Sequence, residues 1–168
     1  MRAVAVGFVV NGEPVQVEVE PRRTLLDTLR EELGLTGAHA GCEQGACGAC
    51  SVLVGDDVVR SCLVLAVSAA GRSITTIEGI GTPEALHPLQ EELRAHHGLQ
   101  CGFCTPGIVL AALDLLARVE RPDEGQVREA LAGNLCRCTG YSGLVAAVVA
   151  AGRRGVGDAS PGAPYAVP

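Results

Sequence analysis

The sequence is densest in cysteine at Gly41-Cys42-Glu43-Gln44-Gly45-Ala46-Cys47-Gly48-Ala49-Cys50, and a fourth cysteine, Cys62, follows soon after. The resulting spacing, C-x4-C-x2-C-x11-C, is the plant-type pattern in which four thiolates hold a [2Fe–2S] cluster. Glycine and alanine fill most positions between the cysteines, so the backbone can fold closely round a cluster and direct N–H groups at its sulfurs. Structural zinc usually takes two C-x2-C-like knuckles and is the weaker alternative. We therefore expect an irregular cluster-binding loop over 37–50, closed by Cys62 from the strand that follows.

The remaining cysteines form a second set with the spacing C-x2-C-x31-C-x-C: Cys101, Cys104, Cys136 and Cys138. The first pair stands just ahead of Thr105-Pro106, where Thr105 is expected as the N-cap of a helix whose positive end favours thiolate. The second pair follows a helix stop at Gly133-Asn134. Both pairs therefore lie in loops between helices and can meet at one end of a bundle. Spacing alone leaves zinc and [2Fe–2S] nearly even for this second set.

Outward from the first set, residues 1–80 are typical of a sheet with one helix. Asn11-Gly12 predicts a hairpin turn and nothing more. Thr24 offers an N-cap to a helix that Gly34 ends. The expected strands share β-branched residues and span 3–10, 15–19, 51–54, 58–65 and 73–77. This order predicts an antiparallel or mixed sheet with one helix packed against it.

Beyond residue 80 the pattern changes to that of four short helices in a small bundle. They are expected to span 88–97, 108–119, 123–132 and 142 or 143 to 151. The 108–119 helix is apolar on nearly every side, which favours a central position. The chain thus divides into a domain over 1–80, a helical domain over 81–154, and a Gly/Pro/Ala tail over 155–168 that is either flexible or ordered along a partner chain.

The composition excludes several classes of function. The net charge is −6, with two Tyr, two Phe and no Trp, so the chain offers nucleic acid neither a basic patch nor a stacking platform. The longest apolar run, 144–151, falls well short of the about 20 residues that a membrane span needs. The N-terminal apolar stretch has no cleavage site. We expect a cytoplasmic protein with no membrane span.

No constellation for substrate chemistry is recognisable in the sequence: carboxylate pairs, a Ser/His/Asp set and Walker-type loops are all missing. We therefore predict no catalytic residue on this chain. The histidines are expected at the surface or at helix ends, because eight cysteines already make two full ligand sets. They are His39, His87, His96 and His97.

The cysteine motifs extend into longer strings. Around the second set these are Leu99-Gln100-Cys101-Gly102-Phe103-Cys104-Thr105-Pro106-Gly107 and Asn134-Leu135-Cys136-Arg137-Cys138-Thr139-Gly140-Tyr141. Together with the string at 41–50, and over about residues 3–152, they resemble the small iron–sulfur subunit of the xanthine oxidase family of molybdenum hydroxylases. The resemblance implies an α+β fold, with an N-terminal β-grasp plant-type ferredoxin domain and a C-terminal four-helix bundle domain. It assigns one [2Fe–2S] cluster to each set of four cysteines.

The resemblance also implies partner subunits. A large subunit would carry molybdopterin, in its cytosine dinucleotide form, and a medium subunit would carry FAD, in a dimer of heterotrimers. Gln100 and Cys138 would lie next to the partner's molybdopterin. The implied function is to relay electrons from the molybdopterin site through the two clusters to FAD, during hydroxylation of a small substrate with oxygen from water.

Neither the substrate nor the electron acceptor can be read from this chain. Two rival functions stay open at this point. One is a free-standing ferredoxin that visits several enzymes, and the other is a structural module with two zinc sites.

Overall fold

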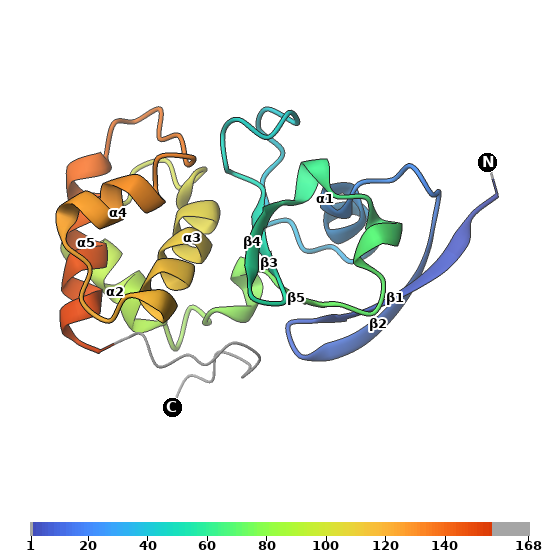
Figure 1. Ribbon diagram of the computed structural model, residues 1–168, viewed down its shortest axis with the longest axis horizontal. Helices are drawn as coiled ribbons and strands as arrows, with labels where there is room; N and C mark the ends of the chain where they lie inside the picture. Colours follow the sequence, from blue (N-terminus) through green and yellow to red (C-terminus); the bar gives the residue numbers. More distant parts are fainter. Residues whose placement is uncertain (1, 156–168) are drawn as a thin grey trace.

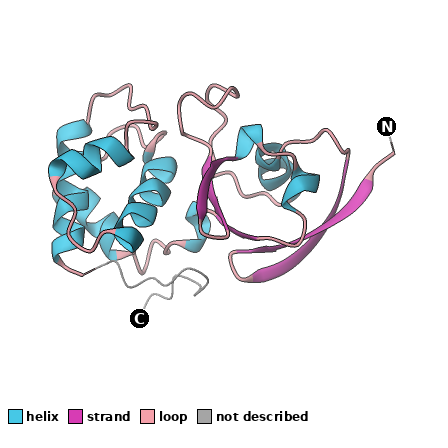
Figure 2. Cartoon of the chain, in the orientation of Figure 1, coloured by secondary structure: helices cyan, strands magenta, loops and turns pink. Residues whose placement is uncertain are grey.

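The computed structural model describes residues 2–155 of the chain. From residue 156 on, the expected tail lies outside the described residues. Residues up to about 80 form a five-stranded mixed sheet in the order β2-β1-β5-β3-β4, and helices gather at the other end of the molecule (Figures 1 and 2). The strands are β1 (Val4–Val10), β2 (Glu13–Val19), β3 (Ser51–Val54), β4 (Asp57–Arg60) and β5 (Ser73–Thr75). The α+β class expected from the sequence is confirmed.

The first hairpin pairs β1 with β2 in antiparallel register, from Val4 opposite Val19 to Val10 opposite Glu13. Asn11 and Gly12 have φ angles of 51° and 87°, which are the positive values that a tight hairpin turn requires. The predicted hairpin turn is confirmed. The Asn11 side chain also donates to Thr76 Oγ1 and accepts from the Thr76 backbone N–H, both at 2.9 Å. The turn is thereby fastened to the chain just after β5.

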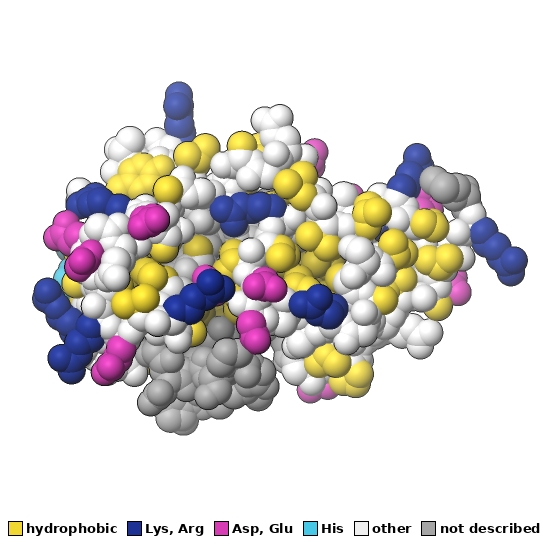
Figure 3. Space-filling view, in the orientation of Figure 1, with side chains coloured by type: hydrophobic (Ala, Val, Ile, Leu, Met, Phe, Trp, Pro, Cys, Tyr) yellow, Lys and Arg dark blue, Asp and Glu magenta, His cyan; other side chains and the backbone are white. Residues whose placement is uncertain are grey.

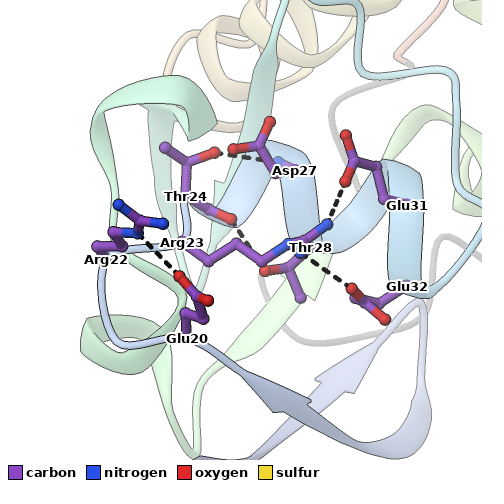
Figure 4. Close-up of polar contacts among 8 residues, drawn as sticks. All are labelled: Glu20, Arg22, Arg23, Thr24, Asp27, Thr28, Glu31 and Glu32. Atoms are coloured by element: carbon purple, nitrogen blue, oxygen red, sulfur yellow. Dashed lines mark hydrogen bonds and ion pairs between the residues drawn. The ribbon is translucent and has the colours of Figure 1, made fainter. Parts of the chain in front are cut away.

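One helical segment crosses the sheet, formed by α1 (Leu25–Asp27) and its π-helical continuation η1 (Thr28–Glu32). The predicted N-cap is confirmed, because Thr24 Oγ1 accepts from the Asp27 N–H at 3.0 Å. The segment buries its leucines against the sheet core, and Gly34, with φ +69°, stands just past its end. On the outer side of this helical segment, the Arg23 side chain forms ion pairs with Glu31 and Glu32, the latter at 3.2 Å (Figure 4).

The edges of the second hairpin differ from the prediction. The strand expected over 58–65 ends at Arg60, and a 3₁₀ turn, η2 (Ser61–Leu63), follows it. Ser61 causes this turn, since its hydroxyl and its N–H both bond to the Cys50 carbonyl, at 2.7 and 3.3 Å. Similarly, the strand expected over 73–77 stops at Thr75. Two more 3₁₀ turns are η3 (Ala66–Ala69) and η4 (Ile77–Gly79).

The helices are α2 (Pro88–Ala95), α3 (Thr105–Arg118), α4 (Glu124–Ala130) and α5 (Tyr141–Arg153). The central position of α3 is confirmed, because most of its residues from Pro106 to Leu116 are buried. Thr105 is not the N-cap as expected. Cys104 takes that position without a side-chain hydrogen bond, and Thr105 is the first helical residue.

The apolar core of the helical part extends into the sheet. Leu53 of β3 and Ile80 belong to the same buried cluster as the apolar side chains of α2, α3, α4 and α5. A second buried cluster lies between the sheet and α1. The two parts of the molecule are therefore packed together through β3 and α3. Among residues 2–155, no helix combines the length and apolar character that crossing a membrane would take.

Candidate iron–sulfur sites

The first set of cysteines comes together at one edge of the sheet. Cys42 and Cys47 lie on the irregular loop, and Cys50 directly precedes β3. Cys62 lies in the turn η2, which corrects its expected place on a strand. Cys47 donates its backbone N–H to Cys42 Sγ at 3.3 Å, and the Cys62 thiol is hydrogen-bonded to that of Cys50. Cys62 also interacts electrostatically with Cys42, so all four thiols share one site.

Backbone N–H groups surround the outer thiol of this site. Those of Gln44 and Cys47 lower the pKa of Cys42 to about 6. The loop reaches this shape through left-handed residues, among them Gly45 at φ +82°. A Cβ on Gly45 would meet only the tip of the exposed Leu63 side chain, so it is the left-handed conformation that calls for glycine. These donors favour thiolate over thiol, as a cluster ligand requires.

The inner thiols have the opposite environment. Cys50 and Cys62 are buried, and burial together with the neighbouring Cys50 thiol raises the pKa of Cys62 to about 11. Two buried thiolates side by side would repel each other in the absence of a positive charge. The site therefore suits ligands that are deprotonated by a bound metal centre.

The second set comes together between α3 and α5. The Cys101 thiol pairs with that of Cys138, and the Cys104 thiol pairs with that of Cys136. Burial, followed by the Cys136 thiol, raises the pKa of Cys104 to about 12. The Phe103 N–H lowers the pKa of the exposed Cys101. As in the first set, one exposed thiol, that of Cys101, has a lowered pKa, and one more buried thiol, that of Cys104, has a raised pKa.

Tyr141, the first residue of α5, helps to shape the second site. Its hydroxyl accepts the Cys136 N–H at 2.7 Å, which fixes the loop that carries the second pair of cysteines. His39 likewise binds no cysteine but is not a free surface residue. Its ring stacks on Phe103 with centroids 4.7 Å apart, and its Nδ1 lies 2.7 Å from the Phe103 carbonyl oxygen. A sequence pattern carries no signal for either contact.

The division into pairs bears on which metal centre fits. Within residues 2–155, no three His, Cys, Asp or Glu side chains converge as they would round one metal ion. Each set instead consists of two thiol pairs, and the pairs interact with each other. A [2Fe–2S] cluster has four cysteine ligands for two irons, which is two thiolates per iron. The donor set and its division fit such a cluster.

Gln100, predicted to face a partner's cofactor, is exposed beside the second set. Its Nε2 lies close to Gly140, where an added Cβ would come within 3.3 Å of it. Exposed apolar residues also lie in or next to the segments that carry the second set. They are Leu99, Phe103, Leu135 and Tyr141. On the face in Figure 3, hydrophobic side chains reach the surface along the upper edge, where the loops between helices lie in Figure 1. The role of Gln100 stays a prediction.

Comparison with known proteins agrees with this chemistry. Residues 8–72 match the family described as 2Fe-2S iron-sulfur cluster binding domain, and residues 76–149 match the [2Fe-2S] binding domain family. The chain is 50% identical over 146 residues to the nicotine 6-hydroxylase small subunit of Paenarthrobacter nicotinovorans, which covers 87% of this chain and 88% of that protein. It is 43% identical over 151 residues to caffeine dehydrogenase subunit gamma of Pseudomonas sp. (strain CBB1), covering 88% and 90%.

A solved structure gives the same result at the level of the fold. The crystal structure of quinoline 2-oxidoreductase from Pseudomonas putida 86 contains a chain that is 48% identical and superposes with a TM-score of 0.86. The match covers 92% of this chain and 99% of that one. The chain therefore belongs to the family of small iron–sulfur subunits of the xanthine oxidase family of molybdenum hydroxylases.

Proposed function

We propose that this chain holds two [2Fe–2S] clusters and is the electron-transfer subunit of a heteromeric molybdenum hydroxylase. The observation that carries the proposal is the grouping of all eight cysteines into two four-thiol sites, each divided into two pairs. When bound, each cluster supplies a centre that takes up and releases one electron at a time. The β-grasp and four-helix-bundle domains, over 1–80 and 81–154, would each hold one cluster.

The proposed ligands of the first cluster are Cys42, Cys47, Cys50 and Cys62, and those of the second are Cys101, Cys104, Cys136 and Cys138. The residues around them act on charge. Four thiolates make each site strongly negative, and the N–H groups of Gln44 and Cys47 at the first site and of Phe103 at the second offset part of that charge. Donors of this kind stabilise the reduced cluster and so set its potential.

The proposed partners are a large subunit with molybdopterin in its cytosine dinucleotide form and a medium subunit with FAD, in a cytoplasmic dimer of heterotrimers. By resemblance, Gln100 and Cys138 would face the molybdopterin; Gln100 is exposed and Cys138 partly so. Electrons would pass from molybdopterin through the second cluster and then the first to FAD. The family names support multi-subunit assembly, because two relatives are called subunits of larger enzymes.

The substrate of the whole enzyme is set elsewhere. Relatives between 42% and 50% identical to this chain carry names that range from nicotine and caffeine to aldehydes. The names differ in substrate while this chain matches each relative at a similar identity, which supports substrate selection by another subunit. The residues that bind substrate would therefore be on the large partner.

The test is anaerobic metal analysis combined with low-temperature EPR of the dithionite-reduced protein, purified with whatever accompanies it. We expect four irons per chain, two distinguishable [2Fe–2S] signals and two larger chains in the same fraction. Zinc in place of iron, with no EPR signal, would exclude electron transfer. Two iron signals on a chain that purifies alone would favour the free-standing ferredoxin instead.

A further inference from the structure

The loops of the two cysteine sites are in direct contact. We call this contact the seam; it is formed by residues 47–48, Gly107 and residues 133–135. The Cys47 carbonyl accepts the N–H of Leu135 at 2.9 Å. Cys47 belongs to the first set, and Leu135 precedes Cys136 of the second. A single hydrogen bond therefore connects the backbone of one site to that of the other. Any shift of the sheet part against the helical part changes the spacing of the two sites.

At three glycines of the seam, backbone approaches backbone closely. A Cβ added to Gly107, in the first turn of α3, would lie 2.1 Å from the Gly48 carbonyl oxygen. A Cβ added to Gly48 would lie 2.4 Å from the Gly133 carbonyl oxygen. Three segments that are far apart in the sequence thus approach at three glycines, where only hydrogen atoms separate them. This close approach brings the sites together but does not lock them.

Arg60 links the two sides of this seam. At the end of β4, its Nη1 donates to Ser51 Oγ at 2.6 Å and its Nη2 donates to the Gly133 carbonyl at 2.8 Å. Ser51 in turn donates its hydroxyl to the Gly48 carbonyl at 2.7 Å. The planar guanidinium holds both acceptors in fixed directions, which an ammonium group could not do.

Asn134 adds a second tie at the same place. It is only 2% exposed, and its Nδ2 donates to the Gly48 carbonyl at 3.2 Å. The Gly48 oxygen thereby receives donors from Ser51 on the sheet side and from Asn134 on the helical side. These polar bonds add direction to the apolar packing through which β3 and α3 already join the two parts.

From this seam we infer that Arg60 is a positioning residue that fixes the distance and orientation between the two iron–sulfur sites. The inference rests on the proposed function, because a fixed spacing matters only if both sites hold clusters. We call the two hydrogen bonds from Arg60, to Ser51 and to Gly133, the clasp. Arg60 contacts no cysteine thiol among the described bonds, so it acts through the loops that carry the ligands. Electron exchange between two centres weakens steeply with distance, and a fixed seam keeps it constant.

The test compares three variants of the whole complex. Arg60→Ala removes both bonds of the clasp. Arg60→Lys keeps the charge but cannot fork between Ser51 and Gly133. Arg118→Ala is the matched control, because it removes an exposed arginine whose one side-chain bond within residues 2–155 is to Asp114. Iron content and EPR of the fully reduced complexes are measured, with the magnetic interaction between the two clusters read as line splitting or as enhanced spin relaxation.

We expect both Arg60 variants to keep four irons and both signals but to lose much of the interaction between clusters, while Arg118→Ala matches the parent. Unchanged interaction in iron-replete Arg60→Ala would overturn the inference and leave the proposed function intact. Absence of iron from the parent complex would instead overturn the proposed function. Should Arg60→Ala fail to fold, Ser51→Ala removes one arm of the clasp and decides the question by the same readout.

Discussion

The two cysteine sites differ in how their parts are brought together. The first is local, with three cysteines on the loop 37–50 and the fourth on the next turn, η2. The second joins the start of α3 to the loop ahead of α5, with the whole of α4 between them. Local backbone geometry therefore builds the first site, and helix packing builds the second. This difference explains why spacing alone favoured iron strongly at the first site but left zinc open at the second.

The sites are alike in their electrostatics. Each has an outer thiol whose pKa is lowered by backbone N–H groups, Cys42 in the first and Cys101 in the second. Each also has an inner thiol whose pKa is raised mainly by burial, Cys62 and Cys104. Two unrelated local structures thus arrive at the same arrangement, which suggests that the chemistry of the cluster sets it.

The largest effect we predict concerns thiol reactivity in chain freed of iron. Because backbone N–H groups lower the pKa of Cys42 to about 6 and burial raises that of Cys104 to about 12, Cys42 is far more ionised at pH 7 than Cys104. Because the thiolate is the nucleophile, Cys42 should be alkylated first and Cys104 among the last. Iodoacetamide labelling at pH 7, read by mass spectrometry over time, measures the order. Equal rates at both positions would show that the paired thiols are not preserved without iron.

The same values set the pH dependence of stability in the iron-free chain. The pKa values of Cys62 and Cys104 are raised in the folded chain. Their contribution to the free energy of unfolding is therefore fully present below the ordinary thiol pKa of 9.0 and is lost as the pH rises toward 11 and 12. The lowered pKa of Cys42 acts in the opposite direction. Its contribution is present above pH 9 and is lost as the pH falls toward 6. Urea unfolding across this range should locate both losses.

A third prediction separates close packing from backbone strain at the seam. Gly48 and Gly34 both have positive φ, but an added Cβ meets the Gly133 backbone at Gly48 and nothing within 4 Å at Gly34. Gly34→Ala should cost about 1–2 kcal/mol for the left-handed conformation alone. Gly48→Ala adds an overpacking cost of about 1–3 kcal/mol. Urea unfolding of both variants measures the difference, and equal losses would mean that the seam gives way easily.

Much of the local structure could be predicted from the sequence, because short-range signals determine it. The N-cap at Thr24 and the central position of α3 follow from neighbouring residues and periodicity. Cys62 was misplaced because apolar residues continue the strand pattern past Arg60. The hydroxyl of Ser61, bonded to Cys50, ends the strand instead. A polar residue inside an apolar run was the available signal.

The contacts between residues far apart in the sequence could not be predicted in this way. Asn11 binds Thr76, His39 binds Phe103 and Arg60 binds Gly133, each across more than sixty residues of sequence. No pattern in the sequence predicts any of these contacts. The grouping of cysteines follows from spacing and resemblance, whereas the seam that holds the groups together is visible only in three dimensions. The ligand assignment itself stays a prediction until iron is measured.

The smallest effect we predict tests whether the second site depends on packing as the comparison implies. Tyr141→Phe removes the hydroxyl that accepts the Cys136 N–H at 2.7 Å, and the loss of this bond should cost about 1 kcal/mol. Because Cys136 belongs to the second set only, one EPR signal of the reduced complex should shift and the other should stay. Ser68→Ala is the control, since it removes a hydroxyl bonded to Leu65, away from the second set.

The outcome of Tyr141→Phe distinguishes two explanations of the second site. A shift confined to one signal, with normal iron content, would mean that α5 positions the Cys136 loop through this hydroxyl. If both signals and the stability match those of the parent, the loop keeps its shape through its own backbone. The second site would then be as local in origin as the first, and the contrast between them would lie in chain connectivity alone.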